Sequence, residues 1–104
     1  MRFVTFQGVV CEVRVGSYSL GKSTSLQLVD YKDKVPYATA TINVSHLDGL
    51  EKDEVAIKNY SENAGMLGAL MEAKIVHPPY RYIHSGFVAI PVCHLTDEFM
   101  KEEM

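Results

Sequence analysis

The regular alternation of apolar and polar side chains constrains the fold of this sequence more than any other feature. In Val9–Val15, and again in Tyr37–Val44, almost every second residue is apolar. A period of two residues is that of a β-strand with one buried face, whereas a helix repeats every ~3.6 residues. Ser25–Tyr31 shows the same pattern, with Leu26 and Leu28 on one side. Because only short connections separate the three segments, the sequence predicts an antiparallel meander.

Glycine and proline indicate where the other strands begin and end. Phe3–Phe6 is predicted to begin the first strand, with a bend or bulge at Gly8. The last strand, Phe87–Leu95, contains Pro91. Because proline has no N–H to donate, we expect this strand to lie at an edge of the sheet or to carry a bulge. Two further short strands are predicted at Val55–Lys58 and Tyr80–His84.

One segment has the period of a helix, with an apolar stripe formed by Met66, Leu67, Leu70 and Met71. Ser61 is predicted as its N-cap, because a serine hydroxyl accepts a hydrogen bond from an unpaired amide of the first turn. The helix is expected to end near Lys74. Gly65 and Gly68 each cost about 1 kcal/mol relative to alanine inside a helix. We expect close approach to another backbone to offset that cost, with the helix packed on the Ala38/Ala40 face of the third strand.

The length of the chain limits the number of domains. A chain of 104 residues suits one domain. We predict an α+β fold in which an antiparallel sheet of about five strands carries one α-helix packed on one face. Residues 1–96 form this domain, and residues 97–104 form an acidic, solvated C-terminal tail. The predicted core combines the helical stripe with the buried sides of the strands: Met66, Leu67, Leu70, Met71, Ala38, Ala40, Ile42, Val44, Val13 and Val55.

The distribution of charge argues against nucleic acid as the partner. The formal net charge is −3, and residues 97–104 account for all of it, so residues 1–96 are neutral. A nucleic-acid binder usually has a basic excess that neutralises phosphates. No apolar run approaches the ~20 residues of a membrane-spanning helix, no signal peptide is recognisable, and two cysteines are too few for a disulfide scaffold. We therefore expect a cytoplasmic protein that has no membrane partner.

No pattern in the sequence predicts catalysis, a bound metal or a cofactor. Zinc needs about four converging ligands, usually in close-spaced pairs. The densest grouping is His77, His84, Cys93 and His94, and its closest pair is adjacent in a predicted strand, so those two side chains point to opposite faces. A nucleophile at Cys11 or Cys93 would need a nearby base, which the sequence alone does not place.

Gly16–Ser23 fits the bare pattern of a phosphate-binding loop: glycine, four residues, glycine, lysine, serine. A working loop of this kind opens a helix whose N-terminus holds the phosphates. The following segment, Thr24–Tyr31, has the pattern of a strand. We therefore interpret Gly16–Ser23 as a hairpin loop, and a small metal- or nucleotide-binding enzyme remains as an alternative.

Two features predict contact surfaces. Tyr80, Arg81 and Tyr82 form an aromatic-basic patch, which Tyr37 and Lys58 could extend. Such rings and guanidinium groups stack on unpaired bases, but rings also cover sheet edges. An edge strand, a tyrosine-rich segment before it and a charged tail together resemble a protein-binding surface, where tyrosine and arginine are enriched. The predicted partner-binding residues are Tyr80, Arg81, Tyr82, Phe87, Asp97 and Glu98.

The second half of the chain resembles a known family. Val55–Leu67, Glu72–Val76 and Ser85–Leu95 are similar to segments of a family of short uncharacterised bacterial proteins carried by phages and conjugative elements. The family has no assigned catalytic residues, so the resemblance implies no site. It implies a setting on mobile genetic elements, where small acidic proteins often bind and disable host defence machinery such as a CRISPR nuclease.

These observations together predict a non-enzymatic protein-binding module, encoded by a mobile element, that inhibits a host defence complex. Its partner is expected to be a host defence protein or a second copy of the chain. One alternative is a nucleic-acid-binding accessory protein of a plasmid or phage, which would use the aromatic-basic patch. The small enzyme described above is the other.

Overall fold

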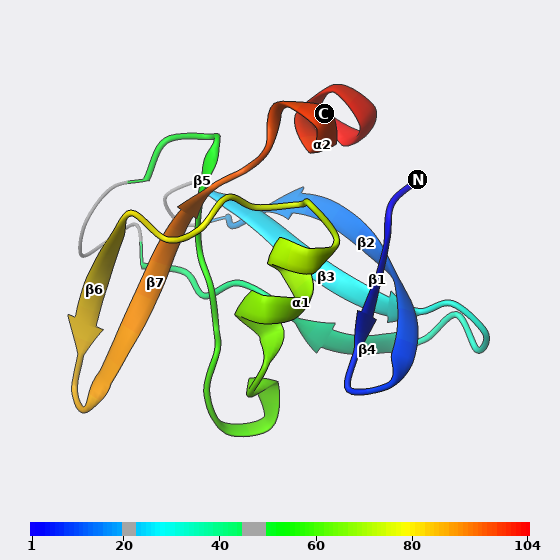
Figure 1. The fold of residues 1–104 in the computed structure, drawn as a ribbon, viewed down its shortest axis with the longest axis horizontal. Coiled ribbons are helices and arrows are strands. Elements are labelled where there is room, and N and C mark those ends of the chain that lie inside the picture. The colour runs from blue at the N-terminus through cyan, green and yellow to red at the C-terminus, as the bar shows by residue number, and fades with distance from the viewer. Residues whose placement is uncertain (20–22, 45–49) are drawn as a thin grey trace.

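The computed structural model describes residues 1–19, 23–44 and 50–104. Within these ranges the chain forms two antiparallel sheets and two short α-helices, so the predicted α+β class and antiparallel arrangement are confirmed (Figure 1). The strands are more numerous than predicted and are divided between two sheets. Residues 20–22 of the predicted hairpin loop lie outside the described residues. None of the described helices is long and apolar enough to cross a membrane.

The first sheet is the predicted meander. Its four strands have the order β1-β2-β3-β4 and are β1 (Phe3–Phe6), β2 (Val9–Ser17), β3 (Thr24–Asp30) and β4 (Pro36–Thr39). The predicted bend at Gly8 is wrong. Gln7 and Gly8 have left-handed φ angles of 52° and 80°, and they form the two-residue turn of a hairpin. Phe3–Phe6 is therefore a separate strand, antiparallel to β2.

The second sheet has three strands in the order β5-β7-β6: β5 (Glu54–Ala56), β6 (Arg81–Ser85) and β7 (Val88–His94). β7 contains Pro91, is central and pairs with both neighbours without a register shift, so the predicted edge position or bulge is wrong. Ile57 N–H donates to the Pro91 carbonyl at 2.9 Å, which places the N–H that Pro91 lacks on the β5 side. The paired register of β5 ends one residue earlier, with Ala56 opposite Val92. The central strand therefore accommodates proline because β5 stops where the donor is missing.

Between Pro91 and the turn of the hairpin, β7 pairs with β6 alone among the described strands. The register of these two strands runs from Tyr82 opposite Pro91 to Ser85 opposite Val88, and Gly86 in the turn has a φ of 60°. We call residues 82–91 the arm. It extends away from the body of the molecule, at the lower left of Figure 1.

An isolated bridge between Thr41 and Ile57 connects the two sheets. Beside it, Ile42 N–H donates to the Ala56 carbonyl and Lys58 N–H donates to the Ala40 carbonyl, both at 2.9 Å. The predicted third strand, Tyr37–Val44, is therefore divided. Its first part pairs with β3 as β4, and its second part pairs with the chain that leaves β5.

The helix is shorter than predicted and begins differently. A 3₁₀ turn, η1 (Ser61–Asn63), precedes α1 (Met66–Glu72), and the N-cap of α1 is Gly65 with a φ of 92°. Ser61 lies in η1 and makes no side-chain cap, so the predicted N-cap is wrong. The expected close approach of another backbone is also wrong, because a Cβ added at Gly65 or Gly68 would meet no atom within 4 Å. Gly65 instead provides a left-handed conformation that starts the helix.

The core lies between α1 and the sheets. Met66 and Leu70 of α1 are fully buried, and the helix packs mainly against β1 rather than on the predicted Ala38/Ala40 face. Six predicted core residues are buried: Met66, Leu70, Val13, Val55, Ala40 and Val44. Leu67, Met71, Ala38 and Ile42 are partly buried against the core clusters.

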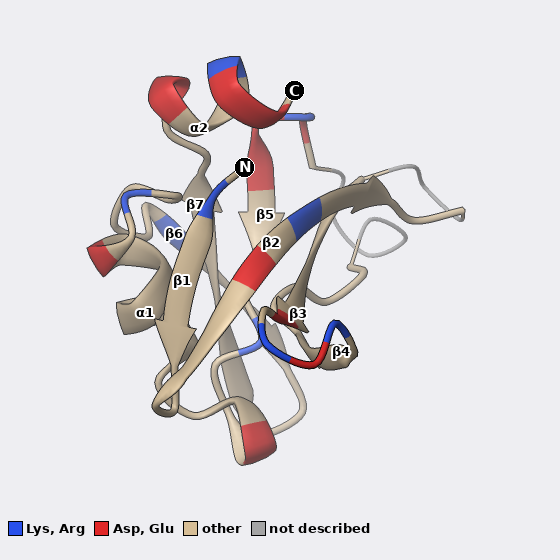
Figure 2. Ribbon diagram, turned by 90° about the vertical axis from the view of Figure 1, so that its right-hand side faces the viewer, with Lys and Arg blue, Asp and Glu red and all other residues tan. Residues whose placement is uncertain are grey.

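Residues 97–104 do not form a solvated tail. They include α2 (Asp97–Glu103), which begins where the Thr96 hydroxyl accepts a hydrogen bond from Phe99 N–H at 3.1 Å. Phe99 is fully buried in the core cluster. Arg2 donates to the carboxylates of Glu98 and Glu102 at 2.8 and 2.6 Å. Figure 2 shows this acidic helix next to the basic start of the chain.

Candidate functional site

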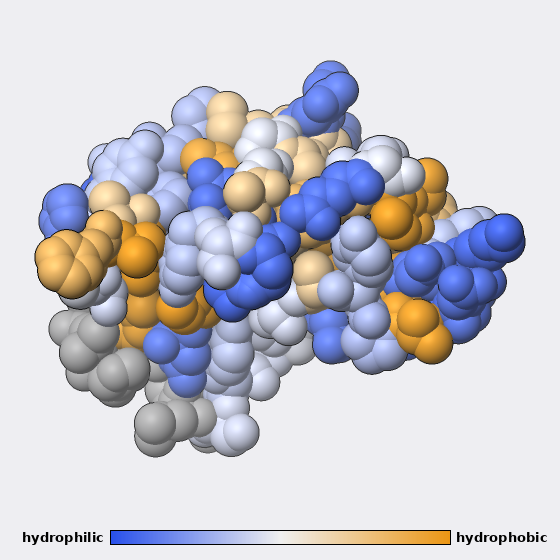
Figure 3. Space-filling model, turned by 90° about the horizontal axis from the view of Figure 1, so that it is seen from below, coloured by the Kyte–Doolittle hydropathy of each residue, from blue (hydrophilic) through white to orange (hydrophobic). Residues whose placement is uncertain are grey.

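The arm presents the most exposed large hydrophobic residue of the described chain. Phe87, at the tip, has a relative exposure of 109%, and Tyr82 is 53% exposed. Tyr82 and Ile83 are neighbours in β6 and therefore point to opposite faces, so that Ile83 is buried against Ile90 while Tyr82 faces solvent. Figure 3 shows hydrophobic side chains gathered at the end of the molecule where the arm lies.

Tyr80 and Arg81 lie at the base of the arm, in a cluster with two residues, Asp53 and His94, that are not among the predicted partner-binding residues. The His94 ring stacks on Tyr80 with 4.4 Å between the ring centroids. His94 Nδ1 lies 3.3 Å from Asp53 Oδ2, and Arg81 Nε donates to the Tyr80 hydroxyl at 3.2 Å. No sequence pattern links Asp53 to His94, because these residues meet only when β5 pairs with β7.

Tyr37 and Lys58 do not extend this cluster. They line a separate hollow of about 380 Å³, together with Tyr18 and Tyr60 among others. Lys58 Nζ lies 2.8 Å from a carboxylate oxygen of Glu62. This hydrogen-bonded ion pair raises the pKa of Lys58 and lowers the pKa of Glu62.

Asp97 and Glu98 belong to a different part of the surface. Both are exposed on α2, which lies at the top of Figure 1, away from the tip of the arm. Glu98 already pairs with Arg2. The predicted partner-binding residues therefore fall into two groups, one on the arm and its base and the other on α2.

The two cysteines do not have the environment of a nucleophile. Both are free and fully buried. Burial raises the pKa of Cys93 to about 11, and burial together with the charge of Asp30 raises the pKa of Cys11. A thiol of this kind is protonated at neutral pH, whereas the thiolate is the reactive form. Among the described residues, no group of three or more His, Cys, Asp or Glu side chains is placed to hold a metal ion.

The loop between β2 and β3 leads into a strand. Thr24 begins β3 and its hydroxyl donates to the Lys52 carbonyl at 2.9 Å. Gly16 and Ser17 belong to β2, while Gly21 and Lys22 lie outside the described residues. A strand after the loop leaves no helix N-terminus at the position where a phosphate-binding loop requires one.

These features define a small α+β domain whose most exposed apolar group, within the described ranges, stands at the tip of a two-stranded arm. No protein-family model matches the sequence, and no curated protein and no solved structure matches it.

Proposed function

We propose that this protein is a non-enzymatic protein-binding module of the cytoplasm and that the arm contacts its partner. The observation that carries this proposal is the complete exposure of Phe87 at the tip of the arm. Moving a phenylalanine side chain from water into an apolar pocket contributes about 1.5–3 kcal/mol. A few interface residues usually contribute most of the binding energy, and aromatic side chains that enter a pocket of the partner are common among them.

The rest of the arm supports this use of Phe87. Tyr82 is 53% and Tyr80 is 49% exposed, so aromatic rings extend from the tip to the base. Tyrosine combines a large apolar ring with a hydroxyl that bonds to polar groups at an interface. A cytoplasmic location is supported by the two unpaired cysteines, since disulfides form mainly in oxidising compartments.

We infer further that the partner belongs to host defence machinery, such as a CRISPR nuclease. The support for this narrower proposal is the resemblance of the second half of the chain to proteins of phages and conjugative elements. One of the resembling segments, Ser85–Leu95, includes the tip of the arm and all of β7.

The nucleic-acid alternative has weaker support from the same surface. Arg81 is the only basic residue of the patch formed by Tyr80, Arg81 and Tyr82. Its guanidinium is already engaged with Tyr80, which in turn stacks on His94. A surface that binds unpaired bases normally combines stacking rings with a positively charged groove.

Affinity capture with matched variants tests the proposal. Tagged wild-type protein, Phe87→Ser and the control Val35→Ser are used to capture partners from a bacterial lysate, with quantification by mass spectrometry. Val35 is 51% exposed and lies between β3 and β4, away from the arm. We expect a partner that wild type and Val35→Ser retain equally and that Phe87→Ser retains at least ~10-fold less. Equal retention by all three proteins would contradict a contact through the arm.

The narrower proposal has its own assay. Purified CRISPR nucleases are tested for DNA cleavage with wild-type protein or with Phe87→Ser. We expect inhibition by wild type and its loss in Phe87→Ser. Cleavage that wild type leaves unchanged would contradict a CRISPR nuclease as the partner but not the use of the arm.

A further inference from the structure

β1 is an edge strand with backbone groups that are unpaired among the described residues. Its pairing with β2 sets their direction, because Val13 N–H donates to the Arg2 carbonyl at 2.9 Å and the register then continues through β1 without interruption. In an antiparallel pair, alternate residues direct their N–H and C=O groups toward the partner strand. The backbone N–H and C=O groups of Arg2 and Val4 therefore point toward β2, and those of Phe3 and Thr5 point outward, away from the sheet.

β1 also lacks several of the usual protections of an edge strand. Proteins block such edges with lysine, proline, bulges or a covering element. Phe3–Phe6 contains no charged residue and no proline, and its pairing with β2 has no register shift. α1 lies beside the strand, but it presents the small side chains of Ala69 and Ala73 on that side. An extended backbone can therefore approach the edge.

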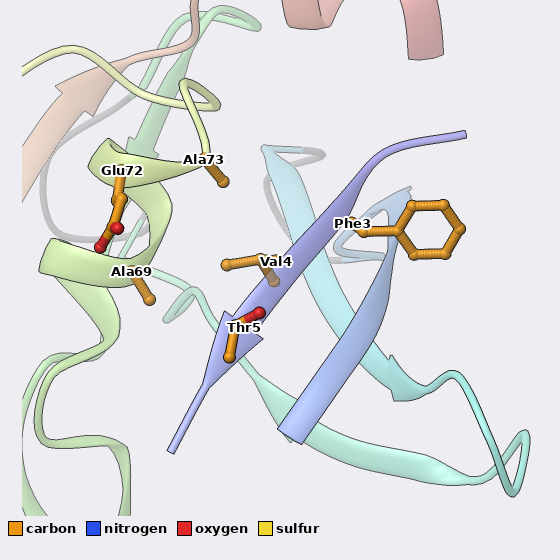
Figure 4. Close-up of a pocket in the computed structure, with 6 residues that line it drawn as sticks. All are labelled: Phe3, Val4, Thr5, Ala69, Glu72 and Ala73. Carbon is orange, nitrogen blue, oxygen red and sulfur yellow. The ribbon is translucent and has the colours of Figure 1, made fainter. Parts of the chain in front are cut away.

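A groove of about 350 Å³ lies between β1 and α1, and we call it the β1–α1 groove (Figure 4). Two hydrogen bonds of 2.9 Å join the strand to the helical segment at its ends. Arg2 Nη1 donates to the Ala73 carbonyl, and Gln7 Nε2 donates to the Glu62 carbonyl. These contacts preform the groove. It is lined by Phe3, Val4, Thr5, Ala69, Glu72 and Ala73.

Glu72 gives the groove a negative charge. Its side chain is exposed and forms no ion pair with another described residue. Arg2, at the end of the groove, is already paired with Glu98 and Glu102. The uncompensated carboxylate at this place therefore favours a basic side chain in whatever occupies the groove.

We propose that the β1–α1 groove binds an extended basic peptide segment of another protein, which adds to β1 as a further strand and places a lysine or arginine beside Glu72. Strand addition pairs the backbone groups of Phe3 and Thr5 irrespective of the peptide's side chains. Ala69 and Ala73 leave space for those side chains, and Glu72 selects for positive charge. This surface is separate from the arm, so the two proposals stand on different observations.

Amide NMR of the full chain tests the groove. The probes are the blocked peptide Ac-Thr-Val-Lys-Val-Thr-Val-NH₂ and a matched peptide with glutamate in place of lysine. We expect the lysine peptide to shift the amide signals of Phe3 and Thr5 and to slow their hydrogen exchange, while the Phe87 signal stays in place. An exposed ion pair contributes ~0.2–1 kcal/mol, so the lysine peptide should bind about 1.5- to 5-fold more tightly.

Two variants separate the contribution of backbone hydrogen bonds to peptide binding from the contribution of the Glu72 charge. Thr5→Pro removes the outward N–H and leaves the β1·β2 hydrogen bonds intact, because that N–H takes no part in them. We expect it to weaken peptide binding about three- to tenfold, and Thr5→Val, which keeps the N–H, to bind as wild type does. Glu72→Lys should reverse the preference in favour of the glutamate peptide.

Three results would overturn the proposal. The first is the absence of shifts at Phe3 and Thr5 with ~1 mM of either peptide, well above the dissociation constant of a specific site. The second is an unchanged charge preference in Glu72→Lys, which remains decisive even if Thr5→Pro fails to fold. The third is concentration-dependent shifts at the same amides without peptide, which would assign the edge to a second copy of the chain. Phe87→Ser should bind the peptide normally, so failure of the groove and failure of the arm are distinguishable.

Discussion

At the scale of single residues, the thiol of Cys93 couples stability to pH. Burial raises its pKa from 9.0 to about 11 in the folded chain. Between these values the unfolded chain loses the thiol proton while the folded chain keeps it, so stability falls as pH rises. We expect a loss of about 2–3 kcal/mol from this group between pH 8 and pH 11.

Urea unfolding of wild type and Cys93→Ala at several pH values measures this effect. Other groups also titrate above pH 9, but they are common to both proteins. The stability advantage of wild type should therefore shrink as the pH rises through this range. A constant difference between the two proteins would show that the thiol ionises equally in the folded and unfolded states.

The sequence predicted some residues of the surface and missed others for a physical reason. The patterns of β6 and of the segment after it were sufficient to select Tyr82 and Phe87, which are exposed in the structure. Asp53 and His94 were missed as a pair, because strand pairing brings them together across 41 residues of sequence. Local patterns describe a residue's own strand but not the strand beside it.

At the scale of elements, alanine substitution is expected to change stability in opposite directions at the two glycines of the helical segment. Gly68 lies inside α1 with open space around it, so Gly68→Ala should stabilise the protein by about 0.5–1 kcal/mol. Gly65 has a φ of 92°, so Gly65→Ala should destabilise it by about 1 kcal/mol. Thermal unfolding of the two variants provides the comparison, each acting as control for the other. Equal effects at both positions would contradict the left-handed start of α1.

The start of this helix and the position of β7 show where element prediction fails. Ser61 has the composition of an N-cap, but the chain turns through η1 before α1 begins at Met66. The missing N–H of Pro91 led to the prediction of an edge strand or a bulge, which is wrong. The sequence did not reveal that β5 ends at Ala56, which leaves a central strand compatible with proline.

At the scale of the whole molecule, α2 fastens the end of the chain to its core. Phe99 is fully buried, so Phe99→Ala should reduce the free energy of unfolding by about 3–5 kcal/mol. Lys101→Ala, on the exposed side of the same helix, should change it by less than about 0.5 kcal/mol. Chemical denaturation measures both values. Similar small effects at the two positions would mean that α2 behaves as the solvated tail expected from its composition.

The packing of α2 could not be read from local patterns. Its acidic composition is that of a solvated segment, and Arg2, which pairs with Glu102, lies 100 positions away in the sequence. The alternating strands and the helical stripe were predictable because their periods are local. Their arrangement as two sheets was not predictable, because the bridge that joins the sheets, between Thr41 and Ile57, connects segments that no period relates.

Pro91 has a mechanical consequence for this molecule. Where β5 ends, a ribbon of three strands becomes one of two, and a two-stranded ribbon twists more strongly and is less stable on its own. The outer part of the hairpin therefore bends more readily than the sheet that supports it. If the arm binds a partner as proposed, that partner can set the direction of the Phe87 ring without deforming the core.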